Sequence, residues 1–148
     1  MSEFISPFQM KGNRIIKFSI NQKDIQHEYD STNASLIVDY EISDIIKTDK
    51  VFNAKVDLNI NILGETNNDE ELFELELTMR GYFEGDCEKV SENKFEDMIK
   101  LNGLSTLIQL SRAYVTAATA LSGFTNPINF PMVNVFELIK MKEEDNKK

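Results

Sequence analysis

The sequence has few of the residues on which many proteins depend for covalent stability or catalysis: one cysteine, one histidine, three prolines and no tryptophan in 148 residues. A single cysteine, Cys87, allows no disulfide within the chain and fits a reducing compartment. The acidic neighbours of Cys87 do not favour the thiolate that a nucleophile needs. The histidine, His27, lies in a polar stretch with no second histidine to share a metal or a proton transfer, so we interpret it as a surface residue.

Positive charge and long apolar runs are also scarce. Lys and Arg number 16 against 25 Asp and Glu, which gives a net charge of -9. Such a chain is poorly suited to neutralising the phosphates of a nucleic acid. No segment approaches the about 20 apolar residues that span a bilayer, and no basic-then-apolar signal opens the sequence. We therefore expect a cytoplasmic protein that binds neither nucleic acid nor membrane.

Recognisable catalytic motifs are missing as well. The six glycines are scattered, and none belongs to a glycine-rich loop with a phosphate-binding lysine. Pairs of carboxylates are frequent, but an acidic chain produces them by chance on its solvated faces. No set of nucleophile, base and metal ligands can be assembled. The sequence predicts a protein that is not an enzyme and needs no cofactor or metal.

Alternation of apolar and polar residues is the main signal in the first half of the chain, and it predicts strands with one buried face. The clearest case is residues 52–62, where every second side chain is apolar and those between are polar. Because the links between such segments are short, the strands must pair antiparallel. The other three segments are residues 16–20, 36–42 and 73–79.

Helical periodicity replaces alternation from Ser91, a suitable N-cap. Asn102-Gly103 predicts a break or kink, and a longer helix follows over residues 104–121, which has more apolar surface than one sheet face requires. Residues 124–132 hold two prolines and four large apolar side chains, which indicates an extended loop that packs or binds. A short helix over about residues 133–142 precedes a charged tail, residues 143–148, expected to be disordered.

Strands first and helices afterwards indicate the α+β class. We predict one domain, residues 1–142, with a four-stranded antiparallel sheet, a long kinked helix and a short C-terminal helix on one face.

In the order of its predicted strands and helices, the chain resembles the SecB family of export chaperones. The similarity covers roughly residues 70–140 and depends on short motifs: Arg80-Gly81-Tyr82-Phe83 at the end of a strand, the helix segment from Leu104 to Arg112, and Pro131, Asn134 and Phe136 before the last helix. The first 70 residues match by strand order and by Arg14-Ile15. Gln109 stands where the family commonly has a proline.

The resemblance implies an ATP-independent holding chaperone that binds unfolded precursor polypeptides, keeps them competent for protein transport, and forms a homotetramer as a dimer of dimers. Its client groove would lie between the loop after the long helix, the last helix and the crossover after the first strand. For Phe136 alone, a role in the core is the stronger expectation. The implied client-binding residues are Tyr29, Phe124, Ile128, Phe130, Met132 and Phe136.

The implied partner is the motor ATPase SecA, which would dock on the acidic face of the sheet through Glu74 and Glu76. Ser19 and Lys23 stand where further acidic residues would be expected. Two alternatives stay open: a SecB-like chaperone of an antitoxin in a toxin–antitoxin system, and a small-ligand-binding or scaffold domain, since a sheet under a long helix can enclose an apolar pocket.

Overall fold

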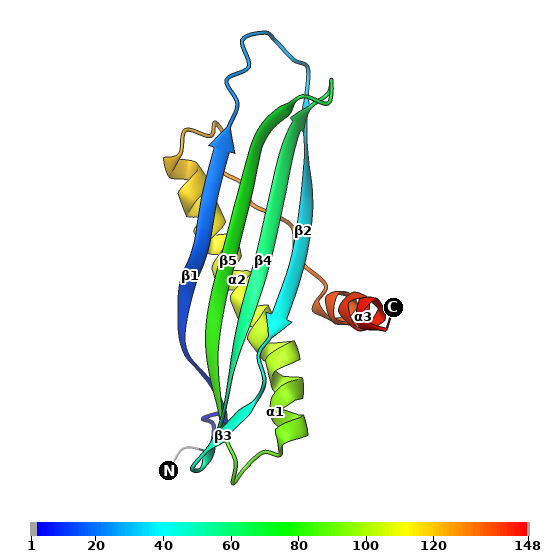
Figure 1. The fold of residues 1–148 in the computed structure, drawn as a ribbon. Coiled ribbons are helices and arrows are strands. Elements are labelled where there is room, and N and C mark those ends of the chain that lie inside the picture. The colour runs from blue at the N-terminus through cyan, green and yellow to red at the C-terminus, as the bar shows by residue number, and fades with distance from the viewer. Residues whose placement is uncertain (1–2, 148) are drawn as a thin grey trace.

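The computed structural model describes residues 3–147 and consists of one antiparallel sheet with helices on one of its faces (Figure 1). The long strands lie in the order β1-β5-β4-β2, so the first and second strands of the chain form opposite edges of the sheet. This arrangement confirms the α+β class. The strands are β1 (Phe8–Gln22), β2 (Thr32–Ile42), β3 (Ile46–Thr48), β4 (Val51–Thr66) and β5 (Glu71–Asp86).

The helical half begins directly after β5 and crosses the back of the sheet as seen in Figure 1. Within residues 3–147, no helix is both long enough and apolar enough to cross a bilayer. The helical elements are α1 (Glu92–Met98), the π-helical turn η1 (Ile99–Gly103), α2 (Leu104–Leu121) and α3 (Val135–Asn146).

The buried face of the central strands follows the alternation in the sequence. In β4, every second side chain from Phe52 to Ile62 is buried, and the intervening ones are at least partly accessible. Leu75, Leu77 and Met79 of β5 continue the same face, and α2 covers it. Each buried Leu or Ile contributes about 1.5–3 kcal/mol relative to an exposed one. The central pair β4–β5 under α2 is therefore the main source of stability.

The strands are longer than the sequence patterns, and a fifth strand is present. β3 has three residues and forms a hairpin with the start of β4, around Asp49 at a φ of 53°. Three residues are too few to show alternation, which is why this strand was not predicted. The edge strand β1 carries two register shifts against β5, at Lys11 and at Ile16. These bulges interrupt the apolar alternation that would have marked its full length.

The kink expected at Asn102-Gly103 is present as the π-helical turn η1, which joins α1 to α2. Such turns are typically local widenings inside a longer helix. A Cβ atom on Gly103 would lie 3.2 Å from the Phe83 ring. The glycine therefore lets the helix approach the sheet closely at this point.

α3 lies beside the edge formed by β2, near η1 (Figure 1). Its N-cap is Asn134, whose side chain accepts a hydrogen bond from the Glu137 amide. The helix extends to Asn146, through residues expected to form a disordered tail, because Glu143 pairs with Lys100 of η1 at 3.6 Å. Lys142 also reaches Asp39 and Glu41 of β2, at 3.1 Å each. These ion pairs hold α3 against η1 and against the edge strand β2.

Four phenylalanines form an aromatic cluster at the end of the sheet beneath α1. Phe95 of α1 lies against Phe8 and Phe52, with ring centroids 5.8 and 5.7 Å apart. Phe8 in turn stacks on Phe83 at 5.3 Å. Gly85 lies under the Phe95 ring, and a Cβ atom there would be 2.4 Å from Phe95 Cδ1. This close approach requires a residue with no side chain.

We predict that Gly85→Ala destabilises the protein by about 1–3 kcal/mol, because the fully buried Phe95 ring has no free space into which to move. Gly12→Ala is the matched control, since nothing lies within 4 Å of a Cβ atom at that position of β1. Urea unfolding of both variants measures the difference. Equal stability of the two variants would contradict the packing described here.

Candidate functional site

A surface cavity of about 590 Å³ lies at the end of the sheet where β2 begins and β4 ends. Two connecting segments form its walls. One is the crossover, residues 23–31, which joins β1 to β2, and the other is the proline loop, residues 123–131, which follows α2. Between these walls, the floor is made by Leu36, Ile62, Gly64, Leu72 and Phe73.

Three side chains of α2 hold the proline loop in place. The fully buried Thr119 accepts a hydrogen bond from the Ile128 amide at 2.8 Å, and the Thr116 hydroxyl donates to the Ile128 carbonyl at 2.9 Å. Arg112 Nε donates to the Phe130 carbonyl at 2.9 Å, and its guanidinium lies over the Phe130 ring. The loop is therefore fixed to the helix through its backbone, which leaves its side chains available to the cavity.

Four of the six client-binding residues expected from the sequence line this one cavity. Phe124 and Ile128 are partly buried, and Phe124 makes an edge contact with Phe73 at a centroid distance of 4.9 Å. Tyr29 comes from the crossover and is 40% exposed. Phe130 is only 4% exposed and belongs to the hydrophobic core, so its ring supports the wall from behind.

The other two residues, Met132 and Phe136, lie outside the cavity, just beyond its Pro131 end. They are 72% and 70% exposed. The stronger expectation for Phe136, a place in the core, is wrong. Leu138 is the buried residue of α3, and the two-residue offset turns Phe136 toward solvent. Met132 and Phe136 are two exposed apolar side chains, one directly after the proline loop and one in the first turn of α3.

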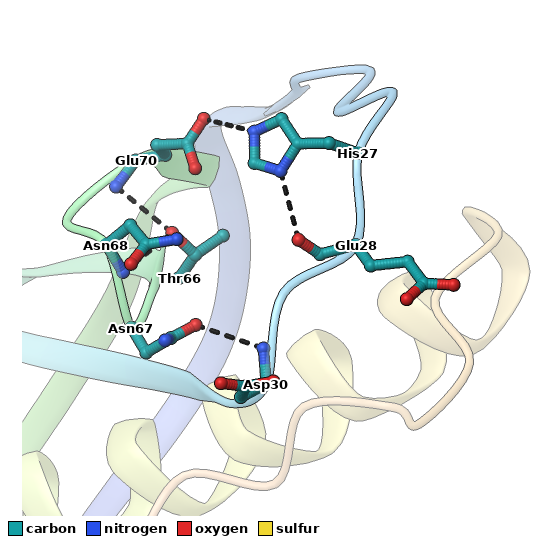
Figure 2. Close-up of polar contacts among 7 residues, drawn as sticks. All are labelled: His27, Glu28, Asp30, Thr66, Asn67, Asn68 and Glu70. Carbon is teal, nitrogen blue, oxygen red and sulfur yellow. Dashed lines mark hydrogen bonds and ion pairs between the residues drawn. The ribbon is translucent and has the colours of Figure 1, made fainter.

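Polar contacts fix the crossover to the β4–β5 turn, as Figure 2 shows. His27 Nε2 lies 2.8 Å from Glu70 Oε2, and His27 Nδ1 lies 3.0 Å from the Glu28 carbonyl oxygen. The Asn67 side chain accepts a hydrogen bond from the Asp30 amide at 3.1 Å. The bonds to the Glu28 carbonyl and to Glu70 raise the pKa of His27. His27 is thus an exposed residue, as expected, but its contact with Glu70 is a feature that spacing in the sequence did not reveal.

The opposite face of the sheet carries Glu74 and Glu76, the residues expected to dock a partner. This face is not purely acidic, because basic side chains form ion pairs with its carboxylates. Lys17 of β1 pairs with Glu76 in this way. Arg80 binds both carboxylate oxygens of Asp57, at 2.7 and 2.9 Å. These contacts raise the pKa of Arg80 above its usual range. The charged side chains of this face therefore largely satisfy one another across neighbouring strands.

The residues that line the cavity suit the binding of apolar groups. Among residues 3–147 no cluster of three or more His, Cys, Asp or Glu side chains could hold a metal ion. The walls offer aromatic and aliphatic groups, with amides and hydroxyls between them. Such a site suits apolar side chains carried on a polypeptide, or a small apolar molecule.

No protein-family model matches this chain, and no curated protein matches it by sequence. Among solved structures, its fold is similar to that of a SecB-like chaperone from Mycobacterium tuberculosis, solved in complex with a ChAD peptide from the HigA1 antitoxin. The TM-score is 0.60 at 12% identity, over 86% of this chain and 91% of the other. A protein of unknown function from Streptococcus agalactiae matches at a TM-score of 0.49 and 10% identity, over 84% and 97%. At 12% identity the first likeness shows that the fold is SecB-like.

We predict that Thr119→Val loosens the proline loop, because the Ile128 amide loses its buried acceptor while the side-chain volume stays the same. The expected loss of stability is about 1–3 kcal/mol. Faster hydrogen exchange at the Ile128 amide would report the local effect. The control is Thr106→Val, whose exposed hydroxyl only donates to Asn102 of the same helix. If both variants lose the same stability, Thr119 does not anchor the loop.

Proposed function

We propose that this protein is an ATP-independent holding chaperone, which binds unfolded polypeptides at the cavity between the crossover and the proline loop. The observation that carries the proposal is the set of apolar side chains Tyr29, Phe124 and Ile128 at the cavity, followed along the chain by Met132 and Phe136, which are about 70% exposed. Exposed large apolar side chains next to a cavity are typical of binding surfaces. The SecB-like fold, and the peptide bound to the SecB-like neighbour, support the same function.

A holding chaperone must bind many sequences without a specific pocket. Burial of an exposed Met or Phe against a client contributes about 1.5–3 kcal/mol. A few such contacts per chain give weak, reversible binding, and linked sites strengthen it by raising the effective concentration of the client. Assembly of several copies therefore belongs to the proposal.

The expected assembly is a homotetramer in the cytoplasm. α2 offers a surface for it, because Leu121 is 88% exposed and Ala113, Ala117 and Ala120 are exposed on the same helix. Small side chains let a second helix approach closely, and burial of Leu121 would remove an apolar group from water. Packing of α2 against α2 of another copy is the contact we propose.

The resemblance to export chaperones implies a partner that takes the client from this protein. Docking of the motor ATPase SecA would use Glu74 and Glu76, yet Lys17 already neutralises Glu76 in part. Transfer of precursors for protein export thus requires a partner that displaces this ion pair. The second candidate is an antitoxin client, in line with the peptide bound to the SecB-like neighbour.

A small-ligand-binding domain is the alternative from another class. The cavity of about 590 Å³ falls within the range of small-molecule sites. This function predicts a protein that ignores unfolded chains, and the experiment below separates the two.

We expect size-exclusion chromatography with light scattering to show a tetramer that retains a chemically unfolded, slowly folding protein and delays its aggregation without ATP. The physical reason is that four linked apolar sites bind one extended chain. A monomer that neither retains nor protects the unfolded protein would reject the chaperone and leave the small-ligand site as the better account.

We further predict that Phe124→Ser combined with Ile128→Ser weakens retention of the unfolded protein by about tenfold or more, because two apolar contacts are lost. The control is Ile37→Ser, which changes an exposed apolar residue on the opposite face of the sheet. Both variants must keep the assembly state of the parent protein in light scattering. Equal retention by the double variant and the control would place client binding elsewhere.

A further inference from the structure

The crossover forms one wall of the cavity, and its two ends are fixed by backbone contacts. At its start, the Lys23 amide donates to the Leu72 carbonyl at 2.7 Å. Near its end, the Asn67 side chain accepts from the Asp30 amide, and the Asn67 amide donates to the Ser31 carbonyl at 3.0 Å. Between these points the contact with the β4–β5 turn is made by the His27 side chain (Figure 2).

Both ring nitrogens of His27 face groups that only accept hydrogen bonds. The Glu28 carbonyl oxygen has no proton to give, and a carboxylate such as that of Glu70 only accepts. Both contacts are hydrogen bonds at the same time only when Nδ1 and Nε2 both carry protons, which is the imidazolium form of histidine. A neutral imidazole can make just one of the two bonds.

From this geometry we infer that His27 is a proton-operated latch on the client cavity: as imidazolium it makes both contacts at once and fastens the crossover to the β4–β5 turn through a charged bond to Glu70, and as neutral imidazole it gives up one contact and holds the crossover less tightly. The crossover carries Tyr29, which lines the cavity two residues further along. Fastening the wall pre-organises the cavity and strengthens binding, because less freedom is lost when the client enters. The effect on client binding rests on the proposed function. The contact of His27 with the β4–β5 turn does not depend on that function.

The charges around His27 set the direction of the pH effect. Glu70 faces it from the β4–β5 turn, and Asp24, Glu28 and Asp30 lie on its own segment with Lys23. The bond to the Glu28 carbonyl and the bond and charge of Glu70 raise the pKa of His27 above its ordinary value of 6.5. The latch is thus fully formed below the unfolded-state pKa and loosens as the pH rises through the higher folded-state pKa.

The first test needs no client. Because His27 is the only histidine in the chain, its imidazole resonances titrate without overlap. We expect a pKa above that of the urea-unfolded protein, and a lower pKa in Glu70→Gln, where an acceptor stays but the charge is removed. Glu70 contacts the turn through its backbone, so this variant keeps the turn intact. A pKa equal to the unfolded value, or unchanged in Glu70→Gln, would overturn the latch.

Hydrogen exchange tests the motion. Between pH 6 and pH 8, protection of the amides of residues 24–29, corrected for intrinsic exchange, should fall about two- to fivefold, the change expected for an exposed ion pair. The same comparison in His27→Gln should show no change with pH, because glutamine does not titrate. A fall of equal size in His27→Gln would show that another group is responsible and would overturn the inference.

Measuring the binding of an unfolded client at two pH values tests the latch separately from the proposed function. A histidine-free unfolded protein should bind about two- to fivefold more weakly at pH 8 than at pH 6, and equally at both pH values in His27→Gln. Equal binding by the parent protein at both pH values would overturn the coupling of the latch to clients. Absence of client binding at either pH, with the titration and exchange as expected, would reject the proposed function and leave the latch in place.

Discussion

Burial of the apolar face of β4 and β5 under the kinked helix is the interaction on which the other parts of this molecule depend. Val56, Leu58, Leu75 and Leu77 are almost fully removed from water on that face. Their burial fixes the line along which α2 crosses the sheet. The position of α2 in turn places Arg112, Thr116 and Thr119 where they hold the proline loop. The cavity wall is thus positioned by the core through one continuous chain of contacts.

Much of the fold was accessible from the sequence because it obeys short-range periodicity. The alternation over residues 52–62 identified the buried face of β4 correctly, and Asn102-Gly103 marked the site of the π-helical turn. Features that depend on partners distant in the sequence were not predicted. The strand β3 is too short to show a pattern, and the extension of α3 to Asn146 follows from ion pairs with Lys100 and with β2.

Some residues of the candidate site could likewise be predicted from the sequence, and others could not. Residue type and the position of the proline loop led to Phe124 and Ile128, and the structure places both at the cavity. The orientation of Phe136 was wrong because contacts with β2 and η1 decide which side of α3 is buried, and that side carries Leu138, two residues from Phe136 and on the other side of the helix. The pair of His27 and Glu70 joins residues 43 positions apart, so only the fold brings them together. Residue identity alone assigns no function to such an exposed histidine.

The two bulges of β1 have a consequence for association between molecules. An edge strand of 15 residues would normally offer a long row of free backbone donors and acceptors, on which an aggregating strand can grow. The extra residues Lys11 and Ile16 break that row into three shorter stretches and twist it locally. The bulges therefore make β1 a poorer template than a regular strand of the same length for pairing with another chain.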